Sequence, residues 1–417
     1  MSGEAISGAW PPRSSDAFPR IGRLPAYVLA QVNAEKRARI EAGDDVIDLG
    51  MGNPDLATPE HIVNELLTHA ADGKHHRYSA SRGIYGLREA VAEHYQTRYD
   101  VMLDAEEEVV VTIGVKEGIT HLMLALLEPG DTVLVPSPVY PIHKYSVLFA
   151  GGKVRTIPLV GDDQGNVAGD ALLASVEDAV NSTWPRPKAL FLSFPHNPTT
   201  LVADRSFLEQ AVEVCRRNQL LLIHDFAYAD FGFDAEPPSL LQIPGAKEIG
   251  VEFFSMSKSY CMPGWRVGFC VGNPAMVQAL TRVKSYLDYG IFQPIQIAAA
   301  HALRSGQQCV VATRETYRSR RDALVSSLAE AGWPVAPPPA TMFMWAPIPG
   351  PFLDLDLVEF ARPLLRETGV VVSPGAGFSE EGEGHVRFAL IEPEDRLREA
   401  GERIGRVLRN HASVQRI

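Results

Sequence analysis

The sequence has few cysteines, no long apolar run and no excess of positive charge. Its four cysteines, among 417 residues, form no Cys-x-x-Cys pair and join no histidines at zinc-site spacing, which excludes a disulfide scaffold and predicts no metal site. No apolar run approaches the roughly 18 residues of a membrane span. The 39 Lys and Arg residues against 51 Asp and Glu residues give a net charge of −12, which argues against nucleic acid as a partner.

The N-terminal segment also lacks the pattern of a secretion signal. It reads MSGEAISGAWPPRSSD, with the acidic Glu4 near its start and no apolar core of signal-peptide length. The composition, with 46% hydrophobic and 22% charged residues, is ordinary for a globular protein. We therefore expect a cytoplasmic protein of about two to three domains that binds no membrane.

Short apolar runs alternate with helical patterns over the first three quarters of the chain. EEVVVTIG, TVLVPSP, KALFLSF, QLLLIHD, EFFSMSKS and RVGFCVG predict strands, and EHIVNELLTHAA, GLREAVAEHYQTRY, EGITHLMLALL and SFLEQAVEVCRRN predict helices. Continuous apolar strands separated by helices are typical of a parallel sheet that is buried on both faces. The pattern predicts an α/β fold.

The pattern changes after Pro294. Residues 296–331 predict one long helix, and APPPATMFMWAPI, GVVVSPGAGF and HVRFAL predict strands of a smaller α+β lobe. The proline-rich first 20 residues predict an arm, and residues 26–41 predict a helix that joins the smaller lobe. We predict an arm and part of the small domain over 1–62, a large domain over 63–307 and a small C-terminal domain over 308–417.

Several predicted strands end in polar residues that can bind a ligand. The first runs through Gly114 into a helix start whose free N–H groups can cradle a phosphate, and others run into Asn197, Asp225 and Lys258. Ligands of a parallel α/β sheet bind beyond the carboxyl ends of its strands. Taken singly, each feature also has an ordinary explanation, as a glycine turn, an Asn-Pro turn, a helix N-cap or a surface lysine.

The order of these residues resembles that of the pyridoxal-phosphate-dependent aminotransferases of class I/II. The resemblance runs from DLGMGNPD to HVRFAL and rests on Asn197-Pro198, Asp225-x-x-Tyr228, Ser255-x-Ser257-Lys258, Gly264-x-Arg266-x-Gly268 and Arg387. Its most specific stretch is SMSKSYCMPGWRVGF. The resemblance implies fold type I, with a large domain built on a mostly parallel, seven-stranded sheet flanked by helices and a smaller α+β domain. It also implies pyridoxal 5′-phosphate as cofactor.

The resemblance gives the matching residues roles toward the cofactor ring. Lys258 matches the lysine that forms a Schiff base with the cofactor and later moves a proton. Asp225 matches the carboxylate that keeps the ring nitrogen protonated, and Asn197 and Tyr228 match donors to the 3-hydroxyl oxygen. Tyr140, in PVYPIH, matches the aromatic residue that stacks on the ring.

The same resemblance implies contacts to the phosphate, the substrate and a second subunit. The positions that match phosphate ligands are Ser255, Ser257, Arg266 and the backbone at Val115 and Lys116. Tyr78 matches a tyrosine that reaches the phosphate of the neighbouring subunit, which implies a homodimer with shared active sites. Arg387 matches the arginine that binds the substrate α-carboxylate as a bidentate fork, and Gly52 and Asn197 match positions near that carboxylate.

The segment SYLDYGIFQP bears on the substrate. Dicarboxylate-specific relatives commonly carry a second arginine there, but this segment has none, and its Asp288 would repel a second carboxylate. We therefore expect a small neutral amino acid, and the chain most resembles the bacterial glutamate–pyruvate (alanine) aminotransferase branch. The predicted reaction is a ping-pong transamination between an L-amino acid, alanine, and a 2-oxo acid, 2-oxoglutarate.

Other functions on the same scaffold stay open. Aminotransferases for LL-diaminopimelate, aspartate, methionine or aromatic amino acids are alternatives, and so are pyridoxal-phosphate-dependent lyases and decarboxylases, because fold does not fix reaction. Cys261, in a loop where relatives carry Asn and Ala nearby, is either a reactive thiol or a buried inert one. A DNA-binding regulator ranks last, because it would need an additional N-terminal domain and a basic surface.

Overall fold

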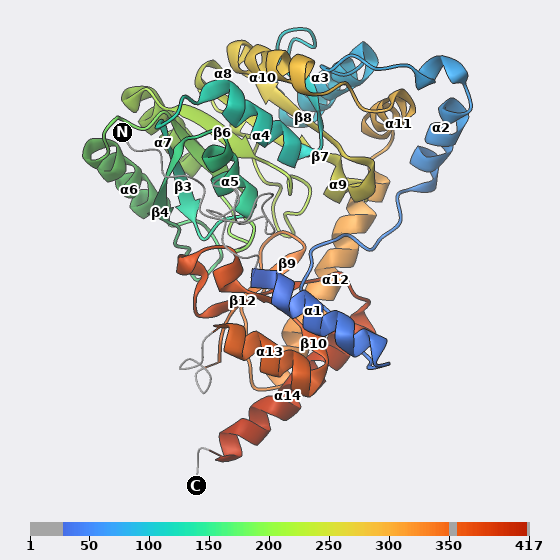
Figure 1. Ribbon diagram of the computed structural model, residues 1–417, viewed down its shortest axis with the longest axis vertical. Coiled ribbons are helices and arrows are strands. Elements are labelled where there is room, and N and C mark those ends of the chain that lie inside the picture. Colours follow the sequence, from blue (N-terminus) through green and yellow to red (C-terminus); the bar gives the residue numbers. More distant parts are fainter. Residues whose placement is uncertain (1–27, 350–356, 415–417) are drawn as a thin grey trace, which may run out of the picture.

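The structure, a computed structural model, describes residues 28–349 and 357–414. Its larger part is built on a seven-stranded sheet (Figure 1). The predicted N-terminal arm lies outside these ranges. The strand order is β2-β8-β7-β6-β5-β3-β4. The strands are β2 (Val109–Ile113), β3 (Thr132–Ser137), β4 (Lys153–Pro158), β5 (Ala189–Ser193), β6 (Leu221–Asp225), β7 (Gly250–Ser255) and β8 (Val267–Gly272). All neighbouring pairs are parallel except those of β8, so the predicted mostly parallel sheet is confirmed.

Helices cover both faces of this sheet. Val133 and Val135 of β3 belong to one hydrophobic cluster with residues of α4, α5 and α10, whereas Leu134 between them belongs to another, with residues of α6 and α7, on the other face. Both faces are apolar for this reason, as the continuous apolar runs predict. The helices of this part are α2 (Glu60–Ala70), α3 (Tyr85–Tyr99), α4 (Val115–Leu126), α5 (Pro141–Phe149), α6 (Gly169–Ser182), α7 (Arg205–Asn218), α8 (Ala246–Ile249), α9 (Met256–Ser259), α10 (Pro274–Leu287) and α11 (Gln293–Arg304).

A second part of the structure packs helices on two small sheets. The long helix α12 leads into it from the part that holds the large sheet, and α14 lies along α12 (Figure 1). Ile47, Phe343, Phe388 and Leu397 are fully or almost fully buried in its core. Its elements are α1 (Val28–Glu41), β1 (Ile47–Asp48), α12 (Gln308–Glu330), β9 (Phe343–Pro347), α13 (Leu357–Thr368), β10 (Val370–Val371), β11 (Ser373–Pro374), β12 (His385–Ala389) and α14 (Glu394–Val414). The predicted domain limits at 62 and 307 stay a prediction.

The predicted single helix over residues 296–331 is wrong. The chain leaves the helical conformation between α11 and α12, at Ser305–Gln307. The side-chain amide of Gln307 explains the break, because its Nε2 donates hydrogen bonds to the carbonyl oxygens of Ala302, Leu303 and Ser305. Gly306, a poor helix former, lies at the same point.

Six helices or strands of the described residues were not predicted from the sequence: α5, β4, α6, α8, α9 and α10. Helix α9 lies where the run EFFSMSKS predicted a strand, because β7 ends at Ser255. Strand β4 pairs only with β3, at the sheet edge, and its residues alternate between exposed and half-buried along most of its length. An edge strand with this polar alternation lacks the continuous apolar run that marks the central strands. Among the described residues, no helix is long and apolar enough to cross a bilayer.

Candidate active site

A cavity of about 410 Å³ opens where β2, β3, β5, β6 and β7 end. It collects all but one of the residues to which the resemblance gives a role toward the cofactor or the substrate. Those that line it are Gly52, Val115, Lys116, Tyr140, Asn197, Asp225, Tyr228, Ser255, Ser257, Lys258, Arg266 and Arg387. The exception, Tyr78, is 84% exposed and lies outside the cavity. Residues distant in sequence meet here because the carboxyl ends of parallel strands share one edge of a sheet.

Lys258 lies in the short helix α9, which begins directly after β7. Its Nζ donates a hydrogen bond of 3.2 Å to the carbonyl oxygen of Gly52. Burial, together with the nearby guanidinium groups of Arg387 and Arg266, lowers the pKa of the Lys258 amine to about 8. A lysine with such a pKa is partly neutral near physiological pH, and the neutral amine is the nucleophilic form.

Asp225 ends β6 and has a partner that the sequence analysis missed. Its Oδ2 lies 2.8 Å from Nε2 of the buried His143, and its Oδ1 accepts a hydrogen bond of 3.1 Å from the backbone N–H of Ala227. The imidazole of His143 stacks on Phe191, with 4.3 Å between the ring centroids. His143 lies in PVYPIH, three residues after Tyr140, but nothing in that segment indicates its contact with Asp225, which is 82 residues away in the chain.

Asn197, Tyr228 and Arg387 form a hydrogen-bonded row across the cavity. Nη1 of Arg387 donates to Oδ1 of Asn197 at 2.8 Å, and Nδ2 of Asn197 lies 3.4 Å from the hydroxyl of Tyr228. Burial raises the pKa of the Tyr228 phenol well above its usual value, although Arg387 lowers it. The phenol is therefore a proton donor throughout the physiological range.

The Arg387 guanidinium is held on several sides. Its Nη2 donates a hydrogen bond of 3.2 Å to the carbonyl oxygen of Gly50. Its Cζ lies 4.0 Å from the ring centroid of Phe343 and 4.6 Å from that of Phe378. Two aromatic faces and two hydrogen bonds fix the plane of a cation that lies at the cavity wall.

The start of α4 and the turn at Arg266 make an anion-binding corner. The N–H groups of the first helical turn, at Val115 and Lys116, have no acceptor within the helix. Gly114 precedes them with φ +72°, and a Cβ at this position would lie 2.1 Å from Nη2 of Arg266. The hydroxyl of Ser255 accepts from the N–H of Ser257 at 3.2 Å. Hydroxyls, amide N–H groups and a guanidinium are the donors that a phosphate requires.

Gly52 lies directly against an aromatic ring of the second part of the structure. A Cβ at Gly52 would meet Cε1 of Phe343 at 2.4 Å. Glycine therefore lets the segment after β1 approach the cavity closely. Phe343 was not singled out from the sequence, because in FMWAP it looks like an ordinary core residue of a strand.

Cys261 takes no part in this cavity. Its thiol is buried, lies 3.7 Å from Oγ1 of Thr313 and has a pKa that burial raises. A raised pKa disfavours the reactive thiolate. Of the two alternatives for Cys261, a reactive thiol or a buried inert one, the structure supports the second.

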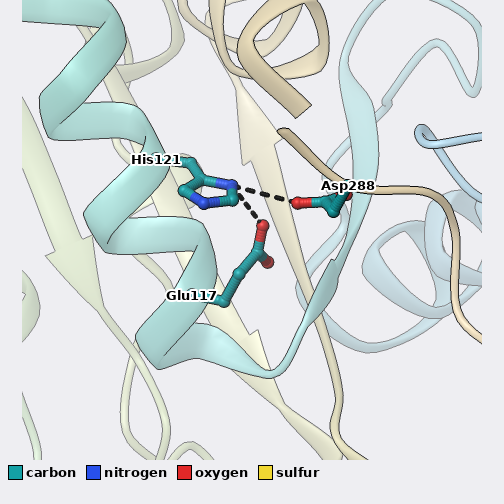
Figure 2. Close-up of side chains that lie close together, drawn as sticks. All are labelled: Glu117, His121 and Asp288. Carbon is teal, nitrogen blue, oxygen red and sulfur yellow. Dashed lines mark ion pairs between the residues drawn. The ribbon is translucent and has the colours of Figure 1, made fainter. Parts of the chain in front are cut away.

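A cluster forms between α4, which carries Glu117 and His121, and Asp288, which directly follows α10 (Figure 2). Nδ1 of His121 is 2.6 Å from Oε1 of Glu117 and 3.2 Å from Oδ2 of Asp288. The ammonium group of the buried Lys284 lies 2.8 Å from Glu117 and 3.0 Å from Asp288. Lys284 thus already supplies a cation to both carboxylates, and we infer no metal site here.

The same cluster corrects the expectation for Asp288. Its carboxylate faces Lys284, four residues earlier on the chain, and does not line the cavity. Ion pairing with Lys284 and His121 explains the orientation. Asp288 therefore does not repel a second carboxylate within this cavity, and the argument for a neutral substrate loses that support.

Known proteins share both the sequence and the fold. The family model for aminotransferase class I and II matches residues 44–404. The chain belongs to the class I and II aminotransferases. It is 50% identical to glutamate-pyruvate aminotransferase AlaC of Escherichia coli over 389 residues, which are 93% of each protein. It is 40% identical to the LL-diaminopimelate aminotransferase of Moorella thermoacetica over 390 residues, which are 93% of this chain and 97% of that protein. The substrate-bound BacF structure from Bacillus subtilis superposes with a TM-score of 0.85 at 34% identity, over 93% of this chain and 96% of BacF.

These likenesses confirm the resemblance drawn from the sequence. The family, the transaminase type of enzyme and the fold, a mostly parallel sheet flanked by helices as in fold type I, are as predicted. The cavity of this aminotransferase also provides what its family's cofactor, pyridoxal phosphate, requires: a partly neutral lysine, an acid with a buried histidine behind it, and a phosphate-binding corner.

Proposed function

We propose that this aminotransferase uses pyridoxal 5′-phosphate to exchange an amino group between L-alanine and 2-oxoglutarate by a ping-pong mechanism. The 50% identity with a glutamate-pyruvate aminotransferase is the observation that carries the choice of substrates. The geometry of the cavity supports the cofactor. Bound there, the cofactor would supply an aldehyde carbon and an electron-accepting ring.

Each residue around the cavity then has a task toward the cofactor. Lys258 would hold the cofactor through its Nζ. Asp225, oriented by His143, holds a proton on the ring nitrogen. Asn197 and Tyr228 donate to the ring 3-oxygen, and Tyr140 covers a ring face. The phosphate is held by Ser255, Ser257, Arg266 and the backbone N–H groups of Val115 and Lys116.

Arg387 binds and orients the amino acid. Its guanidinium, with Cζ 4.0 Å from the ring centroid of Phe343 and 4.6 Å from that of Phe378, would present a fork to the α-carboxylate, and the backbone at Gly52 would close the site nearby. Met51 and Ile142, with Phe343, give the cavity an apolar lining, which suits the methyl group of alanine. The Lys258 amine would take the proton from the substrate Cα, and its pKa of about 8 makes it a competent base near neutral pH.

The protein acts as a homodimer in this proposal. Tyr78, 84% exposed, stacks on Tyr289, 60% exposed, with their ring centroids 4.4 Å apart. Three further exposed apolar residues lie close to Tyr289 in the sequence: Tyr286, Leu287 and Phe292. An aromatic patch of this kind marks an interface, and Tyr78 would contact the phosphate site of a second copy from there. The cytoplasmic location stays a prediction.

A screen of amino donors tests the choice of substrate. Purified protein with cofactor is supplied with L-alanine, LL-diaminopimelate, aspartate, methionine or tyrosine, each against 2-oxoglutarate, and kcat/KM is measured. We expect the highest value for alanine and parallel lines in double-reciprocal plots. The 40% identity with an LL-diaminopimelate aminotransferase makes that donor the second candidate, and a preference for it would overturn the alanine proposal.

A further experiment separates transamination from elimination and decarboxylation. The holoprotein is mixed with alanine in the absence of a 2-oxo acid, and pyruvate and ammonia are measured. Transamination yields one pyruvate per active site without free ammonia, because the amino group stays on the cofactor. Continuous release of ammonia, or loss of carbon dioxide, contradicts the proposal.

A further inference from the structure

A fully buried histidine–glutamate pair lies beneath the active site, on the sheet face opposite to Asp225. His224 precedes Asp225 on β6, so its side chain points to the other face of the sheet. Glu252, on the neighbouring strand β7, places Oε2 at 2.8 Å from Nδ1 of His224. Both side chains are 0% exposed and neither lines the active-site cavity.

Glu252 is surrounded by hydrogen-bond donors. Its Oε1 accepts from the hydroxyls of Tyr95 at 2.8 Å and Ser239 at 2.7 Å, and its Oε2 accepts from the N–H of Leu240 at 2.7 Å as well as from His224. Four donors match the four acceptor sites of a carboxylate. The N–H of Leu240 can only donate, whereas the two hydroxyls can also accept.

This carboxylate determines which nitrogen of His224 carries the proton. Because Glu252 accepts, Nδ1 of His224 is the donor, and Nε2 of the neutral ring is left as an acceptor. The backbone N–H of Phe194 donates to that Nε2 at 3.3 Å. If the proton moved to Nε2, two donors would face each other in a buried space, which is costly.

Phe194 begins the loop that carries Asn197 into the cavity. Asn197 follows Phe194 by three positions, and the two ends of its side-chain amide contact Arg387 and Tyr228. Hydrogen bonds thus connect Glu252 to His224 and His224 to Phe194, and a short loop connects Phe194 to Asn197. Asn197 in turn contacts Arg387 and is the residue proposed to contact the cofactor.

We propose that Glu252 and His224 are positioning residues: Glu252 fixes the tautomer of His224, and His224 anchors the Phe194 N–H and thereby sets the Asn197 amide. The inference rests on the proposed function, since Asn197 is assigned there to the cofactor 3-oxygen. The pair acts from beneath the sheet and touches neither cofactor nor substrate.

Two substitutions at His224 separate anchoring from mere packing. The side-chain amide of asparagine reaches the place of Nδ1, so His224→Asn keeps the bond to Glu252 and loses the acceptor for Phe194. Glutamine reaches the place of Nε2, so His224→Gln keeps an acceptor for Phe194 and loses the bond to Glu252. Glu252→Gln keeps an oxygen for His224, while its amide N–H₂ faces hydroxyls that can accept.

The assay is the visible absorbance of each reconstituted protein as a function of pH, together with the cofactor dissociation constant and KM and kcat for alanine. For His224→Asn we expect the absorbance midpoint to rise by about 0.4–1 pH unit, because the cofactor oxygen loses a donor. We also expect cofactor binding to weaken about threefold to tenfold and KM to rise with a smaller change in kcat. His224→Gln and Glu252→Gln should stay within about twofold of the unmodified protein.

Two results would overturn the inference. One is an unmoved absorbance midpoint in His224→Asn; the other is an equal shift in His224→Asn and His224→Gln. Either would show that the pair only supports packing, and thermal unfolding of each variant measures that role separately. The unmodified protein is the control for the proposed function: if it binds no cofactor, that function fails, whereas a failure confined to the variants concerns only the positioning pair.

Discussion

Replacing Arg387 by lysine probes the substrate site most selectively. The guanidinium donates to Asn197 through Nη1 and to the carbonyl oxygen of Gly50 through Nη2, and it lies between two aromatic rings. Arg387→Lys keeps the positive charge but offers a compact ammonium group in place of the planar fork. The variant therefore loses one of the two hydrogen bonds to the substrate carboxylate. It also loses the planar group that the aromatic rings hold in position.

The expected loss follows from the strength of one charged hydrogen bond. Such a bond contributes about 1.5–3 kcal/mol, which corresponds to about a 10-fold to 100-fold drop in kcat/KM for alanine. Steady-state kinetics with saturating 2-oxoglutarate measure the drop. Cofactor affinity should change much less, because Arg387 is not among the residues assigned to the phosphate or the ring nitrogen.

A matched control is available at Arg320. This buried arginine forms two 2.7 Å hydrogen bonds to the carboxylate of Asp55 and does not line the cavity. Arg320→Lys should lower thermal stability without a comparable change in kcat/KM. If Arg387→Lys leaves kcat/KM for alanine within about twofold of the unmodified protein, the change is smaller than the loss of one hydrogen bond to the substrate would cause. Arg387 would then not bind the substrate carboxylate.

Three further outcomes are expected. The pKa of Lys258 is lowered to about 8. The rate of cofactor attachment to the apoprotein should therefore fall about tenfold per pH unit below pH 8 and become constant above it. A midpoint of this pH–rate curve near the pKa of free lysine, about 10.4, would contradict the prediction. Gly114→Ala places a Cβ 2.1 Å from Nη2 of Arg266 at φ +72°, so we expect a loss of about 1–3 kcal/mol in unfolding free energy, and weaker cofactor binding by titration; unchanged values would refute the close contact. Cys261→Ser should leave kcat/KM unchanged, and iodoacetamide should not label Cys261 in the native protein; rapid labelling with loss of activity would show a reactive thiol instead.

The sequence predicted the parts of the fold whose residues bury on both faces. Strands such as β5 and β6 are continuous apolar runs because helices cover both sides, and this pattern needs no tertiary information. The edge strand β4 and the break between α11 and α12 were not predicted. The first lacks an apolar run, and the second depends on where the Gln307 amide points, which only the packed structure decides.

The same distinction holds for the site. Lys258, Asp225 and Asn197 could be found because each follows a strand that ends at one sheet edge. His143 was not predicted because its contact with Asp225 joins residues 82 positions apart in the chain. Asp288 faces Lys284, only four residues earlier, but its orientation also depends on Glu117 and His121 of α4, which pack against the same pair. Asp288 shows the risk most clearly: a carboxylate expected in the substrate site is instead paired with Lys284.

The most direct test of the central claim is to find which residue holds the cofactor. The protein is reconstituted with pyridoxal phosphate, reduced with borohydride, digested and examined by mass spectrometry. We expect one modified peptide, which contains Lys258, and none in Lys258→Ala. A modification on another lysine, or no modification at all in the unmodified protein, would contradict it.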